Sequence, residues 1–325
     1  MKRCMELMLL FVLIAGMGCD RGGETSTDTK GGSTATPRIA VIPKGTGSIF
    51  WEVVHAGALA GGKDSQVQIE WDGPAKETDT DVEIRILSDM LAKGVNAVVI
   101  APQDASALAE PIKQAHGKLP VVVMDSAVNT PEYTSFVATD NLEGGRIAGR
   151  QMLKLLGDAG GKVAVLCNDP GSASTMDREK GFAEVLAGSK VTIVQQEYHN
   201  SDAQKANRIA LDILLKFPDL AGIYASNEPG TIGVINALKD PQNKDRHLRF
   251  VGFDTSDEIA NALDQGVINA LVLQDPFKMG RVAVETAAKA LKGESVSKEQ
   301  PIPPTLVTAE NKAQPDIQEL LRPKM

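Results

Sequence analysis

Short apolar runs alternate along the chain with segments in which apolar residues recur at helical spacing, beginning at Arg38. The runs predicted to be strands are 38–42, 67–71, 97–100, 120–124, 134–138, 162–167, 191–195, 221–225 and 248–252. Segments with helical period include 79–93, 141–156 and 202–216. Strands that are apolar on both faces are typical of parallel sheets covered by helices on both sides. The pattern therefore predicts an α/β fold with right-handed crossovers and doubly wound sheets.

The pattern also repeats between the two halves of the chain. In the first half "VNAVVIAPQDASAL" precedes "PVVVMDS", and in the second "LAGIYASNEPGTIG" precedes "FVGFDTS". Each half thus has a strand that ends in an aspartate, Asp125 or Asp254. Ligands of open α/β sheets lie beyond the carboxyl ends of the strands. We therefore predict two doubly wound parallel-sheet lobes joined by a hinge, with both aspartates in one cleft.

The N-terminal segment lies outside this pattern. A basic start precedes an apolar run of 12 residues (7–18), which is too short to span a bilayer. The run ends in Gly-Cys, which resembles the lipobox of bacterial lipoproteins. An ordinary cleaved signal peptide is the alternative interpretation. We predict a signal peptide at 1–18, a lipid on Cys19 and a flexible tether rich in Gly, Ser and Thr at 19–36.

Composition narrows the possible functions. The chain has 325 residues, more than a single core usually organises, which agrees with two domains. The net charge is -8 and no basic block is present, so we expect no binding of nucleic acid. The four histidines show no ligand spacing, and we expect neither a metal site nor a cofactor. Cys167 is interpreted as a small buried hydrophobic residue.

A glycine-rich loop, "PKGTGSIFW" (43–51), follows the first predicted strand. Its "GTG" begins a dinucleotide-binding G-x-G-x-x-G pattern, but Phe50 stands where the third glycine belongs. Phe50 and Trp51 are adjacent in a chain that is only 4% aromatic. An aromatic face packs well on the C–H face of a sugar ring, while carboxylates and amides bind its hydroxyls. The loop is therefore predicted to contact a sugar-like ligand rather than a pyrophosphate.

Seven motifs follow one another in a fixed order: "IFWEVVHAGA", "LPVVVMDS", "VATDNLEGGRIAGR", "DREKGF", "YASNEP", "FVGFDTS" and "LVLQDPFKMG". In this order they resemble the periplasmic sugar-binding proteins of the ribose-binding type, the solute receptors of ABC importers. The resemblance extends from about residue 38 to about residue 306. It implies the type I periplasmic binding protein fold, with one lobe made of 37–139 and 275–301 and the other of 140–274 and 302–325.

The resemblance also implies the ligand contacts. Phe50 and Trp51 would flank the sugar ring, and Asp125 would bind hydroxyls from the first lobe. The other implied contacts are Arg178, Asn227, Asp254 and Gln274, with Ser48 and Lys44 as further candidates. Two departures stand out: Ser126 replaces an arginine that is frequent in ribose receptors, and the second-lobe aromatic residue expected near Ser201 is absent from the polar stretch "HNSDAQKA". The site is expected to lack a charged donor at Ser126, which argues against ribose itself as the ligand.

Several of these residues also have purely structural interpretations. Arg178 would pair with a neighbouring acid on an exposed helix face, Asp254 would cap the next helix, and Asn227 would shape a turn. Asp140 is interpreted as a helix cap at the hinge rather than as a ligand contact.

The resemblance implies a clamp that closes on a monosaccharide or related polyol and presents it to the membrane subunits of an ABC permease. We expect a monomer without catalytic residues, in the periplasm or at the cell surface, held to a membrane only through Cys19. One alternative function is a receptor for a sugar-derived signal, because "WDGPAKETD" resembles a segment of autoinducer-2 receptors. Another is a receptor that provides input to chemotaxis or to a sensor kinase. An enzyme is disfavoured because no nucleophile elbow is found. A regulator of the lactose-repressor type is disfavoured because an export signal occupies the place of its DNA-binding headpiece.

Overall fold

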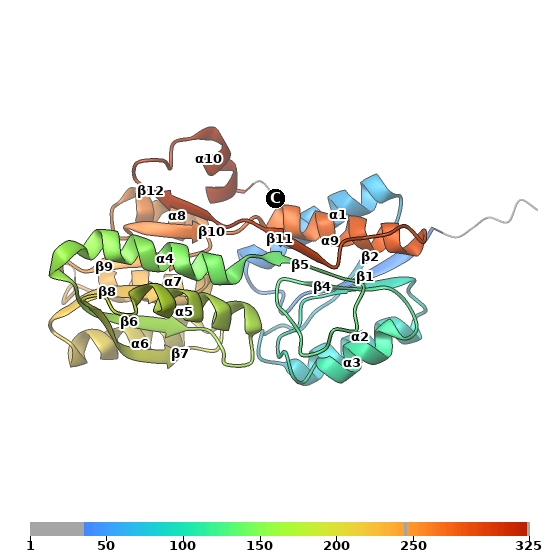
Figure 1. Cartoon of the computed structure of the whole chain (residues 1–325), viewed down its shortest axis with the longest axis horizontal. Helices are drawn as coiled ribbons and strands as arrows, with labels where there is room; N and C mark the ends of the chain where they lie inside the picture. The colour runs from blue at the N-terminus through green and yellow to red at the C-terminus, as the bar shows by residue number, and fades with distance from the viewer. Residues whose placement is uncertain (1–35, 244–245, 324–325) are drawn as a thin grey trace, which may run out of the picture. The chain divides into compact units, whose positions relative to one another are not determined.

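The structure, a computed structural model, describes residues 36–243 and 246–323. The predicted signal peptide, the lipid site at Cys19 and nearly all of the predicted tether lie outside the described residues. Within them the chain forms two six-stranded sheets, each in a lobe of its own (Figure 1). The prediction of two parallel-sheet α/β lobes is thereby confirmed.

The first sheet is entirely parallel, in the order β11-β5-β4-β3-β1-β2. Its strands are β1 (Arg38–Ile42), β2 (Gln68–Trp71), β3 (Ala97–Ile100), β4 (Val121–Met124), β5 (Ser135–Thr139) and β11 (Glu299–Ile302). The second sheet has the corresponding order β12-β10-β9-β8-β6-β7. Its strands are β6 (Gly161–Cys167), β7 (Val191–Tyr198), β8 (Leu220–Ala225), β9 (Arg249–Phe253), β10 (Ala270–Leu273) and β12 (Thr305–Thr308), of which β12 is antiparallel to β10.

Helices cover both faces of each sheet. The first lobe has α1 (Ile49–Ser65), α2 (Thr80–Ala92), α3 (Ala109–His116) and α9 (Pro276–Leu291). The second has α4 (Asn141–Leu156), a 3-10 turn (Gly157–Ala159), α5 (Ala173–Leu186), α6 (Ala203–Lys216), α7 (Glu228–Lys239), α8 (Asp257–Asp264) and α10 (Pro315–Leu321). Among the described residues, none of these helices has the length and hydropathy needed to cross a membrane.

The apolar strands divide their side chains between two cores. In β1, Ile39 and Val41 pack with α1 and α9, whereas Ala40 and Ile42 pack with α2 and α3. The side chains of a strand point alternately to opposite faces, so a strand covered on both sides is apolar at every position. In β6 the same division places Val163 and Val165 against α4 and α5, and the alternate residues against the helices of the other face. This two-sided burial explains the uninterrupted apolar runs.

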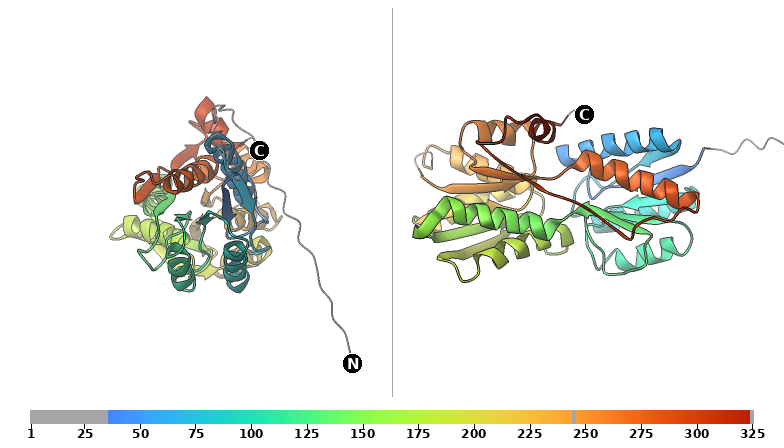
Figure 2. Two further views of the ribbon diagram at one scale, coloured as in Figure 1. Left: turned by 90° about the vertical axis from the view of Figure 1, so that its right-hand side faces the viewer. Right: turned by 45° about the horizontal axis from the view of Figure 1, so that its top comes forward.

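Each lobe is completed by segments from the C-terminal end of the chain (Figure 2): α9 and β11 join the first lobe, and β12 and α10 join the second. The chain passes between the lobes after β5, after β10 and again between β11 and β12. The strands β10, β11 and β12 are absent from the predicted set. All three have only four residues, and β11, "EQPI", carries polar residues and a proline.

Glycines bring the helices that follow the hinge close to their neighbours. A Cβ on Gly57 of α1 would lie 2.0 Å from the carbonyl oxygen of Phe277 in α9, and one on Gly280 would lie 2.1 Å from that of Val54. The second lobe repeats this arrangement, because a Cβ on Gly145 of α4 would lie 2.0 Å from the carbonyl oxygen of Arg178 in α5. Such contacts exclude any side chain at these positions.

Gly57→Ala is expected to lower the free energy of unfolding by about 1–3 kcal/mol, because the added methyl group must displace backbone. The midpoint of urea unfolding measures this loss. Gly117→Ala is the matched control, since its Cβ would approach no atom closer than 3.6 Å. Equal midpoints for the two variants would contradict this account of the packing.

Candidate functional site

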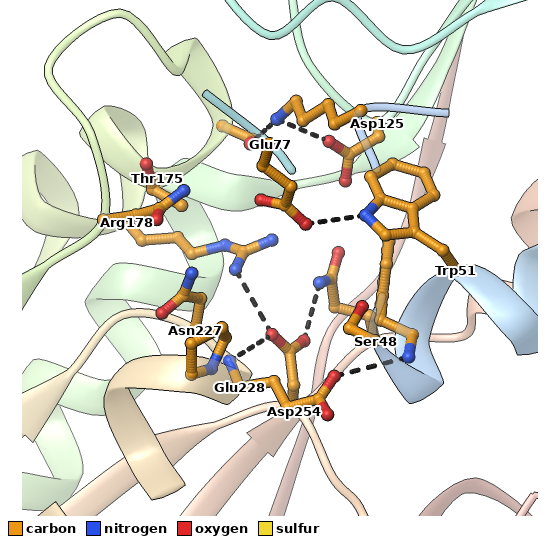
Figure 3. Close-up of a pocket in the computed structure, with 15 residues that line it drawn as sticks. Ser48, Trp51, Glu77, Asp125, Thr175, Arg178, Asn227, Glu228 and Asp254 are labelled. Atoms are coloured by element: carbon orange, nitrogen blue, oxygen red, sulfur yellow. Dashed lines mark hydrogen bonds and ion pairs between the residues drawn. The ribbon is translucent and has the colours of Figure 1, made fainter. Parts of the chain in front are cut away.

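A pocket lies between the two lobes, at the carboxyl ends of their strands (Figure 3). It is lined by Lys44, Ser48, Phe50, Trp51, Glu77, Asp125, Asn168, Ser174, Thr175, Arg178, Asn227, Glu228, Pro229, Asp254 and Gln274. All nine residues predicted as ligand contacts are among them. Their role as contacts stays a prediction, but the structure does bring them together.

The two predicted aspartates occupy equivalent positions. Asp125 follows β4 and Asp254 follows β9, and their φ angles are 64° and 67°. The backbone N–H of Asp125 donates to Val137 of the neighbouring strand, and that of Asp254 donates to Val272. A left-handed conformation is costly for a residue with a side chain, and such conformations concentrate at functional sites. Both side chains are almost fully buried.

Lys44, directly beyond β1, pairs with Asp125. Its Nζ lies 2.8 Å from Asp125 Oδ2 and donates to the hydroxyls of Ser172 and Ser174 at 3.1 and 3.0 Å. These serines belong to the second lobe, so the ammonium group links the lobes. The expectation that Ser126 leaves this side of the site without a cation is therefore wrong, because Lys44 reaches it from another strand.

Arg178 on α5 faces Asp254 in the second lobe. Its Nε donates to Asn141 at 2.8 Å, one Nη donates to the carbonyl of Ser226 at 2.9 Å, and that Nη lies 3.8 Å from Asp254 Oδ2. The guanidinium group also lies over the Phe253 ring, 4.0 Å from its centroid. Arg178 is 2% exposed, so the alternative of pairing on a solvated helix face is wrong.

Asp254 is held by its neighbours within the pocket. It accepts hydrogen bonds from the backbone N–H of Glu228 at 3.0 Å and from Gln274 Nε2 at 2.7 Å. Gln274 in turn accepts from the Thr139 hydroxyl at 2.6 Å. Burial raises the pKa of Asp254, against the opposing effect of Arg178. Asp254 does not cap α8, whose cap is Ser256.

The aromatic pair forms one wall. Phe50 and Trp51 meet edge to face, with ring centroids 4.9 Å apart. Trp51 is 2% exposed and packs into the core of the first lobe, but its Nε1 donates to Glu77 at 2.7 Å. Ser48 precedes them as the N-cap residue of α1, yet its side chain makes no capping hydrogen bond. The Ser48 hydroxyl therefore makes no hydrogen bond to the backbone of α1.

Asn227 has a structural role, as a helix cap rather than in the turn foreseen as its alternative, and it also lines the pocket. Its Oδ1 caps α7 by accepting from the Gly230 N–H at 3.1 Å. Asp140 caps α4 by accepting from Glu143 N–H at 3.0 Å, which confirms its interpretation as a helix cap. Cys167 is fully buried, as predicted, and burial raises the pKa of its thiol.

Six lining residues were missed: Glu77, Asn168, Ser174, Thr175, Glu228 and Pro229. Asn168 directly follows β6, so the rule that selected Asp125 and Asp254 also applies to it. Ser174 and Thr175 lie one turn before Arg178 on α5. Glu77 lies in the irregular segment between β2 and α2, where no periodic pattern marks it.

Hydrogen bonds close the lobes over the pocket. The Ser174 N–H donates to Ser126 Oγ at 3.1 Å, and the Ser201 hydroxyl donates to Glu77 at 2.7 Å. The Phe50 N–H donates to Glu228 at 3.3 Å. Ser126 and Ser201, the two departures noted in the sequence, thus serve as small polar contacts between the lobes.

In the described part of the chain, no group of three or more His, Cys, Asp or Glu side chains is arranged to hold a metal ion. The pocket instead presents acceptors (carboxylates), donors (the Lys44 and Arg178 cations) and groups that do both (amides and hydroxyls) beside an aromatic wall, a set suited to an uncharged or weakly charged polar molecule.

Comparison with known proteins gives a consistent result. A family model described as "Periplasmic binding protein domain" matches residues 39–295. The chain is 30% identical to the ribose import binding protein of Escherichia coli over 69% of its own length and 75% of that protein. A carbohydrate transporter solute binding protein from Agrobacterium radiobacter, solved in complex with D-arabinose, superposes with a TM-score of 0.85. It is 32% identical, and the match covers 89% of this chain and 100% of that one. For an ABC transporter solute binding protein from Agrobacterium vitis with bound D-fucose the TM-score is 0.84 and the identity 33%, with coverage of 87% and 99%.

Proposed function

The chain belongs to the periplasmic binding protein family, and we propose that it is the extracytoplasmic solute-binding protein of an ABC transporter that binds a monosaccharide or related polyol between its lobes. Family membership bears out the reading of the chain as a binding protein rather than an enzyme. Relatives of similar fold and sequence were solved with D-arabinose and D-fucose, which supports a small sugar as the ligand here.

The observation that carries the proposal is the state of the polar atoms in the pocket. Lys44 engages one oxygen of Asp125, while the other has no hydrogen-bond donor in the described structure. One Nη of Arg178 is bonded, and the other has no acceptor among the described residues. Both side chains are nearly fully buried and line the pocket, so a ligand there can reach the two unmatched atoms. Sugar hydroxyls, which donate and accept, suit both atoms.

Ligand binding would act through the lobes. The contacts come from both lobes, so a sugar meets all of them only when the lobes are closed. It therefore favours the closed arrangement by the difference between its affinities for the two states. The closed form is what the permease of an ABC transporter would recognise, and no chemical change of the sugar is required.

Attachment to a membrane is a further part of the proposal. A signal peptide at 1–18, a lipid on Cys19 and a tether at 19–36 would hold the binding domain near its permease as a monomer. The strand order supports the proposed lobes, one made of 37–139 with 275–301 and the other of 140–274 with 302–325. One residue differs, because β11 of the first lobe continues to Ile302.

The proposal is tested by thermal unfolding of the purified chain with a panel of pentoses, hexoses and polyols. A ligand at 100 times its Kd should stabilise the folded state by about 2.7 kcal/mol. Asp125→Asn is expected to reduce affinity for that ligand at least tenfold, measured by calorimetry, because one charged acceptor is lost.

Asp89→Asn, an exposed position on α2, is the matched control and should bind like the parent. If no member of the panel stabilises the protein, the assignment to sugars fails. If Asp125→Asn binds the hit unchanged, the assignment of this pocket fails.

A further inference from the structure

The charges that line the pocket do not balance (Figure 3). The ionisable lining residues are Glu77, Asp125, Glu228, Asp254, Lys44 and Arg178. Lys44 lies 2.8 Å from Asp125 and Arg178 lies 3.8 Å from Asp254, so each cation is matched by one carboxylate. Glu77 and Glu228 remain, with no Lys, Arg or His at ion-pair distance in the described part of the chain.

Glu77 and Glu228 are held only by neutral donors. Glu77 accepts from Trp51 Nε1 and from the Ser201 hydroxyl. Glu228 is 6% exposed and accepts from the Phe50 N–H at 3.3 Å, with no side-chain donor among the described residues. Burial, together with the nearby Asp254, raises the pKa of Glu228 to about 8, so without a cation nearby this carboxyl group is mostly protonated at neutral pH. A buried carboxylate without a cation is unfavourable and takes up a proton instead, whereas a cation at this position would restore its ionised form.

Helix ends supply part of that charge. Glu228 is the first residue of α7, and its partner Phe50 lies in the first turn of α1. Each helix N-terminus is equivalent to about half a positive charge, so the two ends together offset about one of the two unmatched carboxylates. The α7 end is shared, because the Glu228 N–H already donates to Asp254. With Glu77 and Glu228 both ionised, at most about one negative charge would remain in the pocket for a ligand to match.

We propose that the ligand is an aminated polyol, a monosaccharide or cyclitol with one protonated amine that binds Glu228. The inference rests on the proposed function, since it places the amine on a polyol in the same pocket. An ammonium group would favour the ionised form of Glu228 and give it charge-assisted hydrogen bonds, whereas a hydroxyl would give it only a neutral hydrogen bond. Glu77 lies close enough to Glu228 to raise its pKa, and so adds to the attraction for a cation.

The test compares ligands that differ in one group. Monosaccharides and cyclitols with an amine at each ring position are titrated calorimetrically at neutral pH, each beside its hydroxyl parent and its N-acetyl derivative. At one position the amine should bind at least tenfold more tightly than both comparison compounds. Glu228→Gln should bring that ratio to about one.

The matched control is Glu52→Gln, an exposed residue of the same helix turn as Phe50, which should keep the preference. If hydroxyl parents bind as tightly as every amine, or if Glu228→Gln keeps the preference, this inference is overturned while the proposed function stands. If neither amines nor parents bind, the proposed function itself fails.

Discussion

Arg178→Met is expected to reduce sugar affinity at least 100-fold and to destabilise the protein by roughly 3–5 kcal/mol. Methionine fills most of the space of the arginine stem, so the loss comes from the guanidinium group. Asp254 would stay buried without a cation, and the Asn141 and Ser226 oxygens would lose their donor. Calorimetry measures the affinity, and urea unfolding measures the stability.

A double variant separates the two losses. Arg178→Met with Asp254→Asn removes both charges, so it should recover much of the stability, because no isolated charge remains buried. Binding should stay weak, since both groups are proposed to contact the ligand. Arg150→Met, which lies on the exposed face of α4, should change neither quantity greatly. Recovery of binding in the double variant would show that Arg178 only neutralises Asp254.

In the absence of sugar, the free energy of unfolding is expected to fall as the pH rises from 5 to 8. Burial raises the pKa of Glu83 to about 8 from an ordinary value of 4.5, and it raises that of Glu179 to about 7. The unfolded chain loses these protons near pH 4.5, whereas the folded chain keeps them, so unfolding releases protons in between. The stability that these two carboxyl groups contribute is therefore fully present below pH 4.5. It is lost as the pH rises through their pKa values in the folded chain.

Glu83→Gln isolates one of these groups. Glu83 is fully buried on α2, accepts from the Gln103 N–H at 3.0 Å, and leaves Oε1 without a partner in the described structure. The variant should gain on the order of 3 kcal/mol relative to the parent between pH 5 and pH 8, measured by urea unfolding. Glu110→Gln, exposed on α3, should not change the pH slope. A slope unchanged by Glu83→Gln would refute the assignment.

His199 opposes this trend only under acid conditions. It is fully buried, and burial lowers the pKa of its imidazole to about 4 from 6.5. The unfolded chain takes up this proton as the pH falls below 6.5, so stability is lost between pH 6.5 and 4. Together with the carboxyl groups, His199 places the expected maximum of stability in mildly acidic solution.

The fold could largely be predicted because strands that are buried on both faces appear in the sequence as uninterrupted apolar runs. The run "IAVI" (39–42) in β1 is apolar at every position because helices cover both sides of its sheet. The edge strands β11 and β12 contain no such apolar run. Their partly exposed side chains are free to be polar, and their pairing depends on where the chain returns from the other lobe.

The site was predictable where a residue directly follows a buried strand. Asp125 and Asp254 lie there, and parallel strands bring such positions to one edge of a sheet. Glu77 belongs to an irregular loop, and its place beside Trp51 is set by tertiary packing alone. Lys44 was a candidate contact, but its pairing with Asp125 was hidden, because the two residues are far apart in the sequence and follow different strands.

Because the chain crosses between the lobes three times, it also fixes the order in which the two lobes can complete their folding during synthesis. Helix α9 covers one face of the first sheet and β11 forms its edge, yet both come after all the helices and strands from α4 to β10. During synthesis, the lobe that is begun first is thus completed nearly last. Until residue 291 has emerged, the apolar surface that α9 covers has no partner helix, so we expect the growing chain to associate with itself most readily in that interval.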